Sequence, residues 1–199
     1  MDYYQIIADN FQSTIETIAM SVDNLAPCIE RGSQLMTQAL LEDRKIVACG
    51  NGADAALAQL FSSNLLSRFE HERPALPALA LGNDGANLTA IADSSGVNEI
   101  FSRQLRALGQ AGDVLLCISS SNGANNLLRA VQTAHERNMA VVVLSNVDDS
   151  ELATLIRSED VHINIDATRR PRVVELQTMA IHCLCELIDH GLFGAYNQV

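Results

Sequence analysis

The residues "DVLLCISSSNGANNLLRAV", from Asp113 to Val131, join a short apolar run, a polar turn and a helical pattern. The run from Val114 to Ile118 is too short for a helix and contains no polar residue, which is typical of a strand buried on both faces. From Ala124 onward the apolar residues recur at the spacing of an amphipathic helix. The stretch therefore predicts a strand, a turn and a helix in succession.

The same alternation extends over most of the chain. The predicted strands are Ile46–Cys49, Leu76–Leu81, Val114–Ile118, Ala140–Leu144 and Val161–Ile165. Helices are expected after "GNGADAA" to about Arg68, at Glu99–Leu108, from Ala124 to about Arg137, at Glu151–Ile156 and at Pro171–His190, with two helical segments ahead of the first strand. This order predicts an α/β fold with a parallel sheet of five strands and helices on both faces.

Two polar turns follow predicted strands, "CGNG" at Cys49–Gly52 and "SSSNG" at Ser119–Gly123. In the common five-strand order, the first and third strands flank the point where the strand order reverses, and ligands bind there. Helix amino termini offer unpaired N–H groups to anions, and serine hydroxyls add donors. A turn that only caps its helix is the alternative. Together the turns favour a small anionic ligand, and the ligand-binding candidates are Asn51, Gly52, Ala53, Asp93, Ser119, Ser120 and Ser121.

The composition limits the class of protein. The chain has 199 residues and a net charge of −11, which suits one domain (1–199, with a helical segment at 1–43 and an α/β core at 44–199) and argues against direct nucleic-acid binding. No apolar run is long enough for a membrane span, and no signal peptide is evident. The five cysteines fit neither a disulfide framework nor a zinc site. We expect a cytoplasmic protein with reduced thiols.

The amino-terminal segment carries a separate pattern. Phe11, Ile15, Ile18, Val22 and Leu25 repeat at intervals of four, three, four and three residues, the seam of a short coiled coil. Such a helix can pack on its own domain or form an interface between subunits. The second interpretation is favoured, since these residues contain no strand of the sheet.

Three blocks of the chain resemble a known family. "KIVACGNGADAALAQLFSSNLLSRFEHERPALPALAL", "RALGQAGDVLLCISSSNGANN" and "VELQTMAIHCLCELIDHGLF" are similar, in this order, to the sugar isomerase (SIS) domain family, to its phosphoheptose isomerase branch and, within that branch, to the DnaA-initiator-associating proteins. The resemblance implies a flavodoxin-like doubly wound sheet, a homotetramer with the amino-terminal helices used in oligomerisation, and a sugar-phosphate pocket lined by the serine turn.

This chain departs from the isomerase pattern at several positions. Leu60 and Asn64 stand where the branch has a His and a Glu, and Val174 stands where it has a Gln. An aldose–ketose isomerisation needs a base and an acid. His182, which is retained, and Glu175, seven residues before it on the same helix face, are the remaining catalytic candidates. We expect no cofactor and no metal site, with zinc only for an isomerase-like protein.

The resemblance and its departures lead to an expectation of function. The principal one is a non-catalytic SIS protein that binds the replication initiator DnaA and promotes initiation, with the apolar pair Leu192 and Phe193 beyond a helix stop at Gly191 as partner surface. The same pair can instead seal the last helix. The alternatives are a phosphoheptose isomerase, converting sedoheptulose 7-phosphate to D-glycero-D-manno-heptose 7-phosphate, and a phosphosugar-sensing regulator. Asp54 places a negative charge near any phosphosugar.

Overall fold

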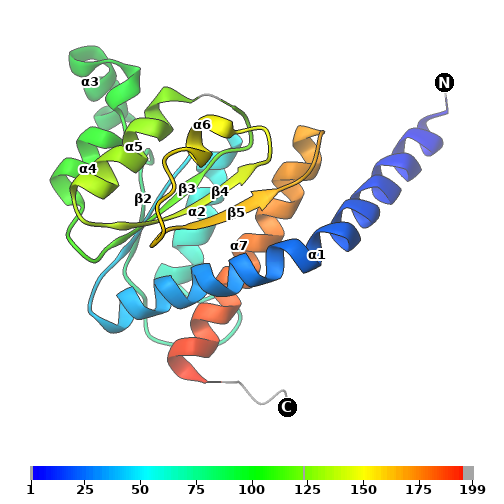
Figure 1. Ribbon diagram of the computed structural model, residues 1–199, viewed down its shortest axis with the longest axis horizontal. Coiled ribbons are helices and arrows are strands. Elements are labelled where there is room, and N and C mark those ends of the chain that lie inside the picture. The colour runs from blue at the N-terminus through cyan, green and yellow to red at the C-terminus, as the bar shows by residue number, and fades with distance from the viewer. Residues whose placement is uncertain (1, 123, 195–199) are drawn as a thin grey trace.

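Five parallel strands form the centre of the protein in a computed structural model, which describes residues 2–122 and 124–194. The strands are β1 (Ile46–Cys49), β2 (Ala78–Ala80), β3 (Val114–Ile118), β4 (Ala140–Asn146) and β5 (Val161–Ile165), in the order β2-β1-β3-β4-β5 (Figure 1). All neighbouring pairs are parallel. The predicted sheet, with its order reversal between the first and third strands, is confirmed.

Helices cover both faces of this sheet. They are α1 (Tyr3–Leu41), α2 (Ala53–Leu66), α3 (Gly85–Ser95), the 3-10 helix η1 (Val97–Glu99), α4 (Ser102–Leu108), α5 (Asn125–Glu136), α6 (Ser150–Ala153) and α7 (Arg170–Phe193). Alternate residues of each strand face opposite layers: Ile46 and Ala48 pack with α1, α2 and α7, whereas Val47 and Cys49 pack with α4, α5 and α6. Both faces of the sheet are therefore dry, which explains the uninterrupted apolar runs of β1 and β3.

The helices differ from the predicted ones at several places. The expected pair of amino-terminal segments is one helix of 39 residues with Pro27 in its interior. The helix continues past the proline because Ile29, Met36 and other residues beyond it are buried in the core, and this packing outweighs the missing hydrogen bond. Helix α3 was not predicted, because none of its residues is buried and no apolar periodicity marks it.

The end of α7 also differs. Gly191 does not stop the helix, which runs to Phe193 and ends at Gly194 with a φ of 83°. Gly191 instead lies at a close approach to α1, where an added Cβ would be 3.0 Å from Cγ2 of Thr37. Leu192 is half-buried against the core and Phe193 is 38% exposed. The predicted partner pair is thus the last turn of a helix.

The heptad seam of α1 divides into two parts. Leu25 is buried and Ile18 packs against the core of its own domain, whereas Phe11, Ile15 and Val22 are 70%, 60% and 56% exposed. Figure 1 shows the amino-terminal half of α1 projecting away from the sheet. Packing on the own domain is therefore confirmed for Ile18 and Leu25, and an interface between subunits stays a prediction for the exposed residues.

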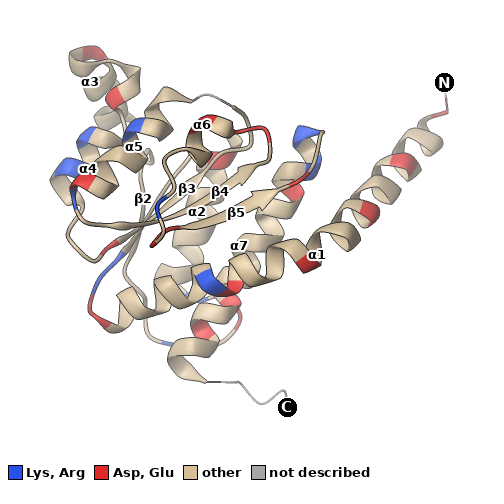
Figure 2. Ribbon diagram, in the orientation of Figure 1, with Lys and Arg blue, Asp and Glu red and all other residues tan. Residues whose placement is uncertain are grey.

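The projecting half of α1 is acidic. Its charged residues before Arg31 are all Asp or Glu, as Figure 2 shows. The acidic half of α1 is therefore unsuited to the phosphate backbone of a nucleic acid.

In the parts of the chain that the structure describes, no helix is long and apolar enough to cross a bilayer.

Candidate functional site

The polar turns after β1 and β3 meet at one edge of the sheet. The two strands are paired in register up to Cys49 and Cys117, so the turns leave the sheet side by side. A reciprocal pair of hydrogen bonds joins them, since the Asn51 amide donates to Asn126 Oδ1 and the Asn126 amide donates to Asn51 Oδ1, each at 2.9 Å. The two turns therefore lie side by side, and we refer to their junction as the crevice; ligand binding there stays a prediction. Asn126, in the first turn of α5, is a member that the sequence pattern did not single out.

The serine turn is held by side chains of its own chain. Ser119 and Ser120 are buried, and Ser121 is exposed. The Ser119 hydroxyl lies 2.7 Å from Asp149 Oδ2 and 2.6 Å from the Ser121 carbonyl oxygen, and it donates its one proton to these acceptors. Arg170 at the start of α7 donates from Nε to Ser120 Oγ at 3.0 Å. Of the three hydroxyls, two are thus engaged within the protein.

A buried carboxylate accepts a hydrogen bond from the backbone of this turn. Asp54, in the first turn of α2, is only 2% exposed, and its Oδ2 accepts a hydrogen bond from the Ser120 N–H at 2.9 Å. Gly52 precedes α2 with a φ of 58°, a conformation that favours glycine, and Ala53 is the exposed first residue of the helix. The expected negative charge near a phosphosugar is therefore bonded directly to a donor of the serine turn.

The remaining candidate, Asp93, lies outside the two turns. Asp93 lies exposed on α3, a helix that packs against η1. Gly123, part of the quoted turn, lies outside the described residues. Helix α5 begins at Asn125, so the three serines precede it by four to six positions. The serines are therefore not part of the first turn of α5.

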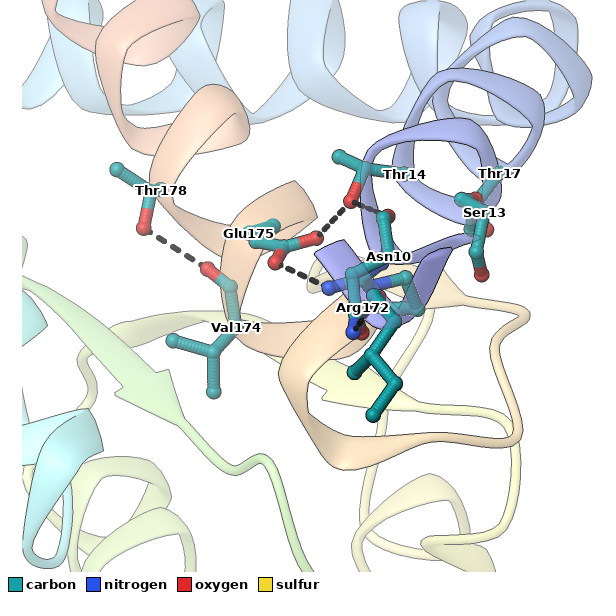
Figure 3. A network of polar contacts seen from close by, with 9 residues as sticks. Asn10, Ser13, Thr14, Thr17, Arg172, Val174, Glu175 and Thr178 are labelled. Carbon is teal, nitrogen blue, oxygen red and sulfur yellow. Dashed lines mark hydrogen bonds and ion pairs between the residues drawn. The ribbon is translucent and has the colours of Figure 1, made fainter. Parts of the chain in front are cut away.

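The catalytic candidates on α7 have separate partners. Figure 3 shows Glu175 Oε1 accepting from Arg172 Nη2 at 2.6 Å and Oε2 accepting from Thr14 Oγ1 at 3.0 Å. His182 is exposed, and its ring lies 5.7 Å from the ring of Phe69 between centroids. Glu175 thus ties α7 to α1, and the Glu–His pair that the seven-residue spacing suggested is not formed.

The face of α2 that packs against α7 carries no set of metal-binding side chains among the described residues. Leu60 packs against the core, and the Asn64 amide lies 3.9 Å from the Cys185 sulfur. Burial raises the pKa of the Cys185 thiol to about 12, which keeps it protonated. Within residues 2–122 and 124–194, no cluster of three or more His, Cys, Asp or Glu side chains is placed to hold a metal ion. These residues do not fit a zinc ion, which requires deprotonated ligands.

Comparisons with known proteins identify the kind of chain to which this one is similar. The SIS domain family matches residues 9–146. A phosphoheptose isomerase of Chromohalobacter salexigens is 47% identical over 98% of this chain and 99% of its own, and one of Alkalilimnicola ehrlichii is 48% identical over 98% and 99%. The structure of phosphoheptose isomerase from Neisseria gonorrhoeae superposes with a TM-score of 0.89 at 37% identity, covering 94% of this chain and 99% of the other. The structure of a phosphoheptose isomerase from Francisella tularensis gives 0.92 at 34%, covering 96% and 100%.

These relatives overturn our principal expectation of function. Four curated proteins that share 44–48% identity over nearly the whole chain are phosphoheptose isomerases, the function that we held as an alternative. The expectation of a non-catalytic protein that binds the initiator DnaA is therefore wrong. It rested on a resemblance to the DnaA-initiator-associating proteins, which these relatives do not show, and on Leu60 and Asn64 standing where the branch has a His and a Glu.

Proposed function

This chain belongs to the SIS domain family, in its phosphoheptose isomerase branch, and from this premise we propose its function. The protein isomerises sedoheptulose 7-phosphate to D-glycero-D-manno-heptose 7-phosphate. The identity of 44–48% with isomerases over nearly the full length carries this proposal. The crevice between β1 and β3 supports it, because polar turns at the switch point of a parallel sheet are suited to the phosphate end of a substrate.

The chemistry requires proton transfer next to a carbonyl group. A base removes the proton from the carbon beside the carbonyl, and an acid returns it to the neighbouring carbon. An imidazole can exchange protons near neutral pH, and His182 is an exposed imidazole on α7. Glu175, held by Arg172 and Thr14, is the carboxylate on the same helix. We assign proton transfer to His182 and the positioning of α7 against α1 to Glu175.

A second candidate function has an observation of its own. Leu60 and Asn64 carry no group that titrates, and they stand where the branch has a His and a Glu. A protein that binds a sugar phosphate without converting it, and so senses its concentration, needs the crevice but no base. This regulator shares the ligand with the isomerase and differs from it only in turnover.

An isomerase assay separates these functions. With sedoheptulose 7-phosphate as substrate, the protein is expected to form the aldose, and His182→Ala is expected to lower kcat by about 100-fold because a positioned proton-transfer group contributes about that much or more. His190→Ala is the control, since His190 is exposed two turns further along the same helix. Saturable binding without turnover favours the regulator. Neither binding nor turnover contradicts both.

We also propose that the projecting half of α1 joins subunits into a homotetramer. The exposed apolar residues of its seam, Phe11, Ile15 and Val22, support this assembly. Phe11→Glu is expected to reduce the molar mass measured by light scattering, because a charge is costly in an apolar interface. Met20→Glu is the control, since Met20 is 81% exposed and lies about half a turn away from Phe11 around the helix. An unchanged mass for Phe11→Glu contradicts an interface through this seam.

A further inference from the structure

The Asp54 carboxylate is the least expected group in the crevice. It is 2% exposed and bonds through Oδ2 to the Ser120 N–H at 2.9 Å, so it links the first turn of α2 to the turn after β3. Carboxylate and phosphate oxygens carry the same sign of charge and accept from the same backbone donors. The donor that a phosphate would use is therefore occupied by an anion of the protein itself.

The neighbouring donor is occupied in the same way. Ser119 Oγ lies 2.7 Å from Asp149 Oδ2, and Asp149 is 2% exposed. Two buried carboxylates thus engage two donors of the serine turn, one through the backbone and one through a hydroxyl. Because Asp54 is part of the chain, its local concentration at Ser120 is far above that of a dissolved ligand.

Only one of the two carboxylate oxygens of Asp54 is hydrogen-bonded to the turn. Its other oxygen, Oδ1, is buried without a hydrogen-bond partner in the described part of the chain. A carboxylate oxygen without a donor is costly to bury, and this cost reduces the stability of the occupied arrangement. The exposed Arg170, whose Nε lies 3.0 Å from Ser120 Oγ, provides a cation at the same turn. A phosphate that arrives here meets one charge that repels it and one that attracts it.

We infer that Asp54 determines the specificity of this crevice by competing, as an internal carboxylate, with the phosphate group of the ligand for the Ser120 N–H. The inference rests on the proposed function in that it takes a sugar phosphate as the ligand. It goes beyond that function because it identifies the residue that lowers the affinity for phosphorylated ligands and leaves the affinity for the unphosphorylated sugar unchanged. A ligand without phosphate has no group that needs this donor, and it is unaffected by the competition.

Calorimetric titration of three ligands tests this competition. With inorganic phosphate and with sedoheptulose 7-phosphate, Asp54→Ser is expected to bind about tenfold more tightly than the native chain, because the internal anion is gone and a charge-assisted bond to Ser120 becomes available. Asp54→Asn, which keeps an acceptor but not the charge, is expected to show a smaller gain. Unphosphorylated sedoheptulose is expected to bind all three forms alike.

Asp148→Asn is the matched control, because it removes one negative charge from an exposed neighbouring loop without touching Ser120. If Asp148→Asn bound phosphate more tightly by the same factor, the change in net charge alone would explain the effect, and the inference would be overturned. So would phosphate affinities that are unchanged in both Asp54 variants, with folding verified by circular dichroism. Turnover by the native chain together with unchanged phosphate affinity of the variants rejects this inference alone. Tighter phosphate binding without turnover in any form rejects the isomerase function alone.

Discussion

Replacement of Arg73 by methionine is expected to lower the free energy of unfolding by about 3–5 kcal/mol, because it leaves a buried charge unpaired. The Arg73 side chain is 1% exposed, and its Nε donates to Oδ1 of Asp189, itself 7% exposed, at 2.8 Å. Its terminal nitrogens donate to the carbonyl oxygens of Asn64, Leu65 and Pro74 at 2.7, 2.7 and 3.0 Å. The variant loses these bonds together.

Thermal and urea unfolding measure this loss, which corresponds to a fall of roughly 10 °C in Tm for a chain of this size. Arg68→Met is the control, since Arg68 and Glu72 form an exposed ion pair of a kind that contributes only about 0–1 kcal/mol. The double variant Arg73→Met, Asp189→Leu is expected to recover part of the stability, because it no longer buries an unpaired carboxylate. Equal losses for Arg68→Met and Arg73→Met would falsify the assignment.

Arg73 illustrates what the sequence could not reveal. It lies between α2 and β2, in a segment without apolar periodicity, and its partner Asp189 is 116 residues away. Nothing local marks such a pair. The same holds for Asp54, whose charge was visible in the sequence but whose contact with Ser120, 66 residues further on, was not. Contacts of this kind depend on how α2, α7 and the sheet are positioned relative to one another.

The strands of the sheet, by contrast, could be predicted from the local sequence. The bounds of β1, β3 and β5 agree with the prediction: β1 and β3 are apolar runs that end at polar or turn-forming residues, whereas in β5 buried apolar residues alternate with His162 and Asn164. Strand β2 is shorter than predicted: Leu76 and Leu81 are buried but lie outside it, and the Leu76 N–H donates to the Leu65 carbonyl oxygen of α2 instead of to β1. That the two glycine-containing turns lie side by side followed from the strand order. What the turns hold could not follow from their composition, because Asp54 and Asp149 also satisfy serine donors.

Substitution of Gly50 by alanine is expected to damage both the fold and the crevice. Gly50 is the last buried residue before the turn after β1, and an added Cβ would lie 2.6 Å from the backbone C and O of Asp54 and 2.8 Å from its Cβ. Backbone atoms cannot swing aside as a flexible side chain can, so the first turn of α2 must move. We expect a loss of about 3 kcal/mol in unfolding free energy, the upper end for overpacking.

The position of Asp54 makes this substitution informative about the site. When the first turn of α2 moves, the carboxylate leaves Ser120 and the Asn51–Asn126 link is strained, so binding of sedoheptulose 7-phosphate should change along with stability. The control is the same substitution at buried Gly32 in α1, where an added Cβ would meet Leu184 and Val142 at an ordinary 3.5 Å. Because alanine favours a helix over glycine by roughly 0.5–1 kcal/mol, Gly32→Ala should be neutral or stabilising. If Gly50→Ala melts and binds like the native chain while Gly32→Ala is destabilised, the close approach of Gly50 to α2 does not position the crevice.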